Sequence, residues 1–422
     1  MKSLVKKSLV AATALSLCAC SSQSKESSTG DAAGNQNVSF TIWHTFTEGQ
    51  QTLLETLANE YETAHTGVSI EVIGGYDPNS FESTVQDAAI NGVGPQLVFN
   101  YASFATNFDG YDMLIDFGAN WDIDLASMMA QGTYAEATGY SDSKIHSVPI
   151  QTTGPVLFYN KAIYDELGLT APSTWDELKE NCKIIYEQTG KVGLAVDSLQ
   201  DLAQMFILQS HDGQYVDADN KKVLWNDEKT LQWVNWWADG VAKGYFQVAP
   251  TTGDYNSSDL NAGALVSYIG SSAGLPYLEL SAINGEVAVT RVPVIDENSK
   301  EVVNWNRSAI GFKKDDATDK VVTDFVKYFI EQDQRWVECL NAYSPYYAVQ
   351  DSESYQAYVA KNIALAALGE QVNDGLVVPA FSGSIQMRDE LKSLFASAAD
   401  PNFDAKSALE NAAKLSEAAM TE

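Results

Sequence analysis

In the first part of the chain, segments with the residue pattern of a strand alternate with segments with the residue pattern of a helix. Residues 38–43, 68–73 and 96–101 are short runs rich in β-branched and aromatic side chains, which favours strands. Residues 48–65 and 81–90 carry apolar side chains at helical spacing. Strands that alternate with helices in this way predict an α/β fold with a largely parallel sheet covered on both faces.

The residues that follow these three strands are candidates for ligand contact. In open α/β sheets, ligands bind beyond the carboxyl ends of the strands. That position holds Trp43 and His44 after the first strand, Tyr76 after the second and Tyr101 at the end of the third. Each of the four has an alternative role. Trp43 and Tyr101 could be core residues at strand ends, His44 could bond to the backbone, and Tyr76 could be an exposed loop residue.

A second group of elements begins near Pro149. Residues 156–159 and 264–269 predict strands, and Thr174-Trp175-Asp176-Glu177 has the spacing of a capping box that opens a helix through Tyr186. The last 70 residues are mostly helical. A chain of 422 residues is also too long for one simple core, so we expect two lobes.

The N-terminus predicts export and a lipid anchor. Residues 1–20 begin with three lysines and continue with a short apolar stretch, which is too short to span a bilayer. The run ends at Leu17-Cys18-Ala19-Cys20, which is similar to a bacterial lipoprotein signal. We therefore expect a signal peptide over 1–19, lipid on Cys20 and, because 20–37 is rich in small and polar residues, a flexible tether there.

Composition narrows the choice of partner. Asp and Glu number 56 against 26 Lys and Arg, which gives a net charge of −30. Phosphate backbones require Lys and Arg, so this balance opposes binding to nucleic acid, and it equally opposes a polybasic membrane patch. It leaves a small ligand open, because a local site can differ from the global charge.

Four segments carry a resemblance to a known family. The most specific is a run that keeps the order Tyr-Asn-Lys, Gly-Leu, Thr-Trp-x-Glu-Leu over residues 154–178. The others are Ile42-Trp43-His44-Thr45, Asn91-Gly92-Val93-Gly94-Pro95 and Asn341-Ala342-Tyr343-Ser344-Pro345. In these segments the chain resembles the family-1 extracellular solute-binding proteins of bacterial ABC importers, which serve sugars or glycerol phosphates.

The resemblance implies a two-lobe periplasmic-binding-protein-like fold of type II, with the ligand in a cleft between lobes that close on it. Lobe one would comprise 38–150 plus 309–345, and lobe two 151–308 plus 346–422. The protein would be a monomer anchored by lipid to the outer face of the cytoplasmic membrane. It would deliver ligand to ABC permease subunits and would use no cofactor and no metal.

The resemblance also implies site residues beyond the strand ends. Hydroxyls at Thr152 and Thr153 open lobe two, Ser271 and Ser272 follow a strand, Trp305 and Arg307 precede the return to lobe one, and Tyr343 lies in the Tyr-x-Pro turn. Four of them also have a plainer interpretation. The two threonines could pack or cap a helix, Trp305 could pack between the lobes, and Arg307 could form a surface ion pair. Aromatic faces and hydroxyl-bonding groups together are typical of carbohydrate sites.

The ligand class stays open between two alternatives. A neutral mono- or oligosaccharide is the leading prediction. A glycerol-3-phosphate or glycerophosphodiester receptor is the alternative, but Ala102 and Ala380 stand where those receptors carry an acidic residue and an Arg. Arg is the preferred bidentate partner of phosphate, so its loss at 380 favours the neutral sugar, although Arg307 and Arg388 offer substitutes.

An enzyme is the remote alternative. Gly270-Ser271-Ser272-Ala273-Gly274 matches the nucleophile elbow of hydrolases, in which the order is Ser, acid, His. All four histidines precede Ser272, so the base is missing in that order. A surface adhesin would predict repeats, and the sequence shows none. We therefore expect a binding protein without catalytic activity.

Overall fold

A mixed five-stranded sheet is built from the first part of the chain and one late strand. Its order is β2–β1–β3–β13–β4. β1 runs parallel to β2 and β3, whereas β13 is antiparallel to β3 and β4. The strands are β1 (Val38–Trp43), β2 (Val68–Ile73), β3 (Leu97–Tyr101), β4 (Ser147–Thr153) and β13 (Trp305–Gly311). The predicted parallel strands are confirmed, and β13 is a strand that the sequence pattern did not reveal.

The structure is a computed structural model that describes residues 37–421, apart from 79, 218–219, 254, 280–285, 377–382 and the side chains of 48 and 120. Residues 37–422 form one compact unit. The predicted signal peptide, most of the tether and Cys20 lie outside the described residues, as does Ala380. Within the described ranges, no helix combines the length and apolar character needed to cross a membrane.

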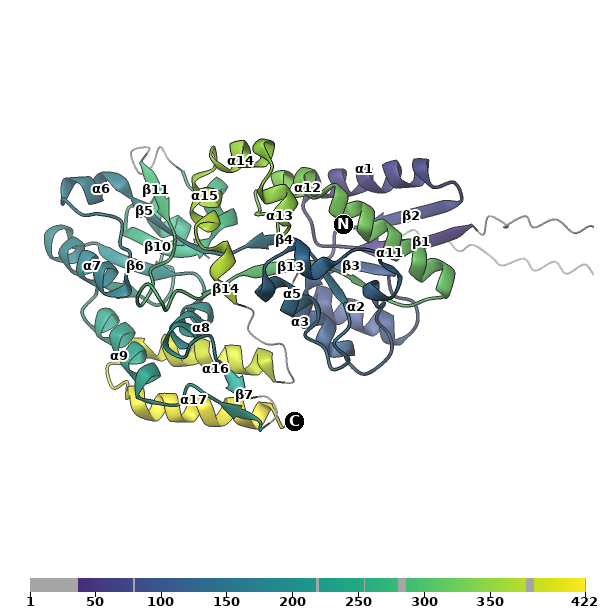
Figure 1. Ribbon diagram of the computed structural model, residues 1–422. Helices are drawn as coiled ribbons and strands as arrows, with labels where there is room; N and C mark the ends of the chain where they lie inside the picture. The colour runs from purple at the N-terminus through teal and green to yellow at the C-terminus, as the bar shows by residue number, and fades with distance from the viewer. Residues whose placement is uncertain are drawn as a thin grey trace, which may run out of the picture. The chain divides into compact units, whose positions relative to one another are not determined.

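Helices cover both faces of the first sheet (Figure 1). One face packs against α1, α11 and α12 around Phe99, and the other against α2 and α3 around Val98. The helices of this part are α1 (Glu48–Ala64), α2 (Phe81–Ile90), α3 (Ala102–Ala105), α4 (Leu125–Met128), α5 (Gln131–Ala137), α11 (Asp316–Glu331), α12 (Asp333–Leu340), α13 (Tyr347–Gln350) and α14 (Glu353–Val359). Tyr346 and Tyr355 also pack in the α1/α11/α12 core.

A second five-stranded sheet has the order β11–β5–β10–β6–β9, in which β5 alone runs opposite to its neighbours. Its strands are β5 (Pro155–Asn160), β6 (Val192–Val196), β9 (Phe246–Gln247), β10 (Leu265–Ser271) and β11 (Val287–Thr290). Two-stranded pairs join β7 (Val216–Asp217) to β8 (Lys222–Val223) and β12 (Val302–Val303) to β14 (Gly375–Leu376). Both large sheets are therefore mixed.

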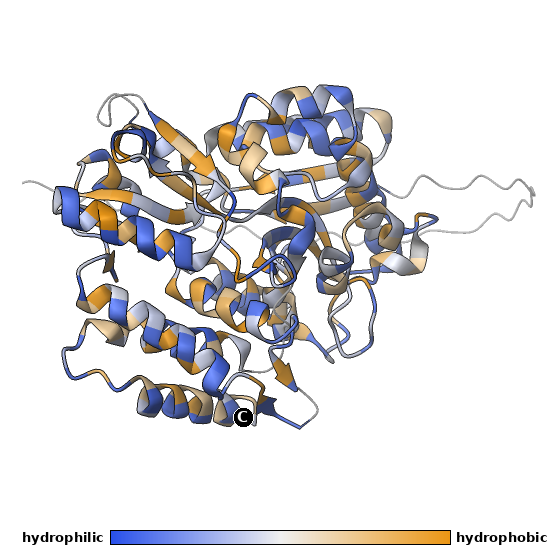
Figure 2. Cartoon of the chain, turned by 60° about the vertical axis from the view of Figure 1, so that its left-hand side comes forward, coloured by the Kyte–Doolittle hydropathy of each residue, from blue (hydrophilic) through white to orange (hydrophobic). Residues whose placement is uncertain are grey.

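The helices of the second sheet are α6 (Lys161–Glu166), α7 (Trp175–Thr189), α8 (Leu199–Ser210), α9 (Glu228–Ala242), α10 (Asn256–Asn261), α15 (Ile363–Gly369), α16 (Ser384–Ala396) and α17 (Ala405–Ala419). Trp175, Trp225 and Trp237 are fully buried in their core. Figure 2 shows hydrophilic and hydrophobic residues on different sides of many helices. The two body cysteines are free: Cys182 is buried in this core and Cys339 is exposed.

Local sequence signals explain where helix α7 begins and ends. The Thr174 hydroxyl accepts a hydrogen bond from the Glu177 amide at 3.2 Å, and the Glu177 carboxylate accepts one from the Thr174 amide at 3.2 Å. This is the capping box that the sequence predicted. The helix ends at Gly190, whose φ of +69° lies in the left-handed region that favours glycine.

The chain passes between the two sheets in three places. Residues 152–155 connect β4 directly to β5, and residues 303–305 connect β12, whose side chains lie in the second core, to β13. A third passage begins near Tyr343, because Ala342 belongs to the first core and Ala364 to a core of the second sheet. We refer to these as the three crossing segments.

Thr152 links all three crossing segments through hydrogen bonds. Its hydroxyl donates to Asn306 Oδ1 at 2.7 Å, and Asn306 Nδ2 donates to a Glu136 carboxylate oxygen at 2.7 Å. Its amide donates to the Tyr343 carbonyl, and the Tyr343 amide donates to the Thr152 carbonyl, both at 2.8 Å. The side chain of Thr152 is 1% exposed, so losing these bonds leaves polar groups buried without partners.

Replacing Thr152 by Val should lower the free energy of unfolding by about 1–3 kcal/mol, because Asn306 Oδ1 would lose its buried donor. Denaturant unfolding measures this change. The matched control is Thr153→Val: Thr153 is part-exposed, and no hydrogen bond of its hydroxyl is recorded. The control should stay within about 0.5 kcal/mol of the parent. Equal effects of the two variants would contradict the linking role of Thr152.

Burial raises the pKa of Asp333 to about 8, against an ordinary value of 3.8. Asp333 begins α12 and is 1% exposed; Ser344 donates to its Oδ2, and its Oδ1 has no partner. The folded chain therefore holds this proton between about pH 4 and 8, where the unfolded chain has released it. Stability contributed by Asp333 is lost as pH rises through that window.

Asp333→Asn should flatten this dependence, because an amide carries no titrating proton. Unfolding free energies at pH 5, 6, 7 and 8 should fall more steeply for the parent than for the variant, by more than ~1.4 kcal/mol, the equivalent of one pKa unit. The exposed Asp316→Asn serves as control. Parallel curves for the parent and Asp333→Asn would show that Asp333 is not the group responsible.

Candidate functional site

Three neighbouring strands place a row of site residues side by side. In the register of the first sheet, Arg307 on β13 lies opposite Tyr101 on β3 and opposite Gln151 on β4. Trp305 lies opposite Thr153, two residues away from Arg307 on β13 and from Gln151 on β4. Alternation along each strand puts Arg307, Tyr101 and Gln151 on a common face. We name Tyr101, Gln151, Thr153, Trp305 and Arg307 the strand-end site.

Aromatic rings surround the guanidinium of Arg307. Its Cζ lies over the ring of Phe46 at 5.2 Å and over the ring of Tyr101 at 5.6 Å from the ring centroids. Tyr101 is 40% exposed, so this face reaches the surface. Trp305 is part-exposed and packs at the edge of the second core. The site therefore combines exposed aromatic surface with a charged donor.

Two polar atoms at the site, Arg307 Nε and Gln151 Oε1, are buried without a hydrogen-bond partner in the described part of the chain. Buried polar groups normally have partners, because an unmade hydrogen bond costs about 1–3 kcal/mol. Unmatched donors and acceptors gathered near exposed aromatic rings are what a site for a polar ligand requires.

Trp43 and Tyr76 form a second aromatic pair at the ends of β1 and β2. Their rings stack with centroids 5.0 Å apart, and both are part-exposed. Burial raises the pKa of the Tyr76 hydroxyl. The structure thus brings these two predicted residues together, but on the face of the sheet that packs against α2 and α3, away from Phe46.

His44 differs from the expectation of direct ligand contact. Its side chain is 0% exposed, its Nδ1 accepts a hydrogen bond from the Phe46 amide at 3.0 Å, and its ring stacks on Phe46 at 5.3 Å. Burial lowers the pKa of the imidazole, against the opposing effect of Glu55. His44 is therefore a neutral group that positions Phe46 beneath Arg307.

Two predicted hydroxyls are likewise engaged inside the protein. Thr152 makes the buried bonds described above, and Ser272 is 1% exposed, with its amide donating to the Gly154 carbonyl at 2.8 Å. The adjacent Ser271 is part-exposed and caps a short 3₁₀ turn, where its hydroxyl accepts from the Ala273 amide at 3.3 Å. The hydrogen bonds recorded for Ser272 go to Gly154 and not to a histidine.

Tyr343 lies beside the first crossing segment. Its backbone pairs with Thr152, and its part-exposed ring stands edge-on to Tyr355 with centroids 5.8 Å apart. Burial raises the pKa of its hydroxyl. The structure therefore gathers Tyr343 with Thr152, Thr153 and Trp305 at the crossing segments.

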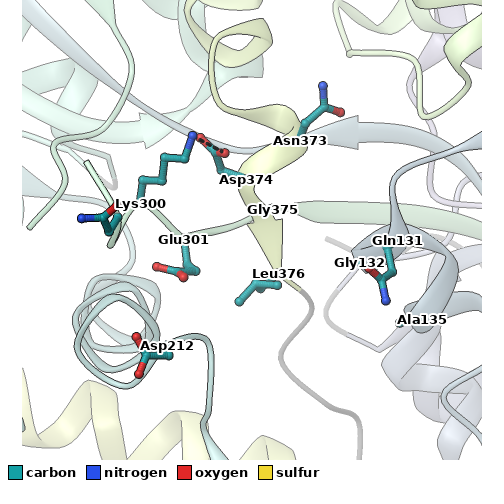
Figure 3. Close-up of a pocket in the computed structure, with 11 residues that line it drawn as sticks. Gln131, Gly132, Ala135, Asp212, Lys300, Glu301, Asn373, Asp374, Gly375 and Leu376 are labelled. Atoms are coloured by element: carbon teal, nitrogen blue, oxygen red, sulfur yellow. Dashed lines mark ion pairs between the residues drawn. The ribbon is translucent and has the colours of Figure 1, made fainter. Parts of the chain in front are cut away.

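A pocket of about 540 Å³ lies between α5 and β14, and the sequence did not indicate it. Its lining comes from α5, from the turn after α8 and from the segments around β12 and β14 (Figure 3). The lining residues are Gln131, Gly132, Ala135, Asp212, Asn298, Lys300, Glu301, Asn373, Asp374, Gly375 and Leu376. We name this the α5–β14 pocket.

Charged groups in this pocket are partly matched. Lys300 and Asp374 form an ion pair at 3.2 Å. Burial raises the pKa of Glu301, Asp212 and Asp374 raise it further, and Glu301 Oε2 is buried without a partner. The pocket therefore offers amides and carboxylates beside apolar surface.

The α5–β14 pocket and the strand-end site are joined by short stretches of chain. Glu136 of α5 accepts the hydrogen bond from Asn306, which lies between Trp305 and Arg307. Glu301 precedes β12, which leads through Asn304 to Trp305. The pocket forms where α5, the turn after α8 and the segments around β12 and β14 meet, and no local sequence signal reports contacts between segments so far apart.

Comparison with known proteins agrees with this architecture. The structure superposes on the cyclic alpha-maltosyl-1,6-maltose binding protein from Arthrobacter globiformis with a TM-score of 0.80 and 20% identity, covering 91% of this chain and 99% of that one. It is similar to the sugar-binding protein MalE from Xanthomonas citri, with a TM-score of 0.78, 15% identity and coverages of 91% and 98%. At these identities the likeness shows the fold, and it confirms the predicted two-lobe α/β class.

A shorter sequence match involves the arabinooligosaccharide-binding protein of Halalkalibacterium halodurans. The two are 30% identical over 93 residues, which is 22% of this chain and 21% of that protein. Residues 56–363 match the model of the bacterial extracellular solute-binding protein family, which is more than half of the chain. The chain therefore belongs to the bacterial extracellular solute-binding protein family.

Proposed function

We propose that this protein captures a carbohydrate outside the cell and delivers it to the permease of an ABC importer. The observation that carries this proposal is the strand-end site, where Tyr101 and Trp305 flank polar groups that have no partner within the protein. Aromatic faces pack on the apolar faces of sugar rings, and unmatched polar groups bond ring hydroxyls.

The position of the site supports capture by closure. Thr153, Trp305 and Tyr343 all lie at crossing segments, so a ligand held there would contact groups on both sides of the passage between sheets. Such a ligand would stabilise the closed form of the two lobes over the open form if the closed form makes more of these contacts. The α5–β14 pocket, whose amides and carboxylates suit hydroxyl groups, extends the surface that a longer saccharide could use.

The comparisons support the same direction. The similar proteins named above are sugar-binding proteins by name, and the family comprises binding proteins. We propose binding without turnover by a monomer. Glycerol-3-phosphate or a glycerophosphodiester remains the second candidate ligand, and Arg307, which has aromatic neighbours but no carboxylate partner, is the observation that favours it.

The N-terminal residues complete the proposal. A receptor that works outside the cytoplasmic membrane needs a tether, and Cys20 followed by a polar linker provides one. The division into lobe one (38–150 plus 309–345) and lobe two (151–308 plus 346–422) also stays a proposal, whereas Tyr346 and Tyr355, which it assigns to lobe two, pack in the first core.

Tyr101→Ala should weaken binding of the best saccharide about tenfold or more, equivalent to ~1.4 kcal/mol, because an exposed stacking surface is lost. Isothermal titration of the full chain measures this. Tyr111→Ala is the matched control, since Tyr111 is 71% exposed and outside the site. Both variants should keep the parental melting temperature. Unchanged affinity in a folded Tyr101→Ala protein would remove Tyr101 from the site.

Cys20→Ser should abolish lipid attachment, because the thiol that would accept the lipid as a thioether is missing. Cells fed a radiolabelled fatty acid should label the parent and not the variant, and the variant should appear in the medium. Cys18→Ser is the control and should remain labelled. Membrane retention of Cys20→Ser after normal processing would refute the lipid anchor.

A further inference from the structure

Of the four arginines in the sequence, Arg307 alone has no carboxylate partner among the residues that the structure describes. Arg291 pairs with Asp374 at 3.3 Å, Arg335 with Glu60 at 2.8 Å and Arg388 with Asp201 at 2.9 Å. All four arginines belong to the described part of the chain, and no described carboxylate lies within ion-pair distance of Arg307. Since acids outnumber bases 56 to 26, carboxylates are abundant, and this exception calls for a reason.

The contacts that Arg307 does make leave its hydrogen-bonding capacity unused. Its guanidinium lies over the rings of Phe46 and Tyr101, at 5.2 and 5.6 Å from their centroids. Contacts with ring faces engage the flat surface of a guanidinium and none of its five N–H donors. Arg307 Nε is buried and has no partner. The rings thus hold the charge in place without neutralising it.

The surroundings keep this charge available to a ligand. Arg307 is part-exposed, and its neighbour Tyr101 is 40% exposed, so the guanidinium lies in an accessible part of the strand-end site. His44, whose ring stacks on Phe46, has its pKa lowered by burial, which favours the neutral imidazole. Gln151, opposite Arg307 on β4, is also neutral.

We propose that the saccharide captured at this site carries an anionic oxygen group, a carboxylate or a phosphate, which Arg307 receives through two parallel N–H···O hydrogen bonds. The inference rests on the proposed function and narrows its ligand class. A planar guanidinium matches the two oxygens of a carboxylate or phosphate, and such charge-assisted pairs are stronger than bonds to neutral hydroxyls. A neutral sugar would leave a fixed, unpaired cation at the site.

The test compares acidic saccharides with neutral forms of the same skeleton. The probes are glucuronate- and galacturonate-containing trisaccharides, their methyl esters, glucose-6-phosphate, glycerol-3-phosphate, maltotriose and arabinotriose. Isothermal titration of the full chain at low and high salt gives each affinity. We expect an acidic probe to bind at least tenfold more tightly than its neutral counterpart, and the difference to shrink as salt rises.

Variants assign the preference to Arg307. Arg307→Gln should lose at least tenfold in affinity for the acidic probe and lose less for its neutral counterpart, so that the preference between the two probes falls. Arg307→Lys keeps the charge but lacks the planar fork, so it should lose part of the preference for acidic over neutral probes. If Arg307→Gln does not fold, this partial loss is the result that assigns the preference to Arg307. Arg335→Gln removes a surface arginine elsewhere and should leave all affinities unchanged.

The outcomes separate this inference from the function on which it rests. Preference for a uronate identifies a carboxylate and preference for a sugar phosphate identifies a phosphate, and both support the inference. Tight binding of maltotriose or arabinotriose, with no preference for acidic probes, overturns it and leaves carbohydrate capture intact. Binding of no probe at all overturns the proposed carbohydrate function, and the inference fails with it.

Discussion

The hydrogen bonds of Thr152 are the constraint on which the rest of the structure depends. Through Asn306 and Tyr343 they join the three crossing segments, and through Asn306 they also reach Glu136 on α5. The donors and acceptors of these hydrogen bonds lie in the interior, where an unpaired polar group lowers stability, so breaking the network would destabilise the fold. This network therefore also fixes the backbone of the neighbouring residues Thr153, Trp305 and Arg307.

Alternation along β4 and β13 turns that constraint into a site. Thr152 and Asn306 point into the network, so Thr153, Trp305 and Arg307 point to other faces of the same strands. The first pair has its polar atoms matched inside the protein, whereas Arg307 Nε and Gln151 Oε1 have no partner. One residue step thus separates groups that stabilise the fold from groups that are free to bind a ligand.

Sequence patterns predicted much of the fold because its strongest signals are local. The capping box at Thr174 and the parallel strands at 38–43, 68–73 and 96–101 depend on spacing within short segments. The antiparallel insertion of β13 between β3 and β4 could not be predicted this way, since it pairs residues about 200 and 150 positions apart. The α5–β14 pocket was missed for the same reason.

The sequence named candidate site residues but could not predict which of their side chains are buried. The family resemblance implied that Thr152, Thr153, Ser271 and Ser272 all lie near a ligand, and only packing shows that Thr152 and Ser272 are buried. His44 likewise follows the end of β1 as the sequence indicated, and only packing shows that it is fully buried. The lack of a carboxylate near Arg307 depends on three strands at once and has no signature in the sequence.

A crystal structure of the chain with its tightest-binding saccharide would test the central claim most directly. The account predicts a sugar ring packed on Tyr101 or Trp305, with hydrogen bonds to Arg307 or Gln151. A saccharide bound only elsewhere, for example in the separate pocket of about 440 Å³ beside residues 171–173, would contradict it.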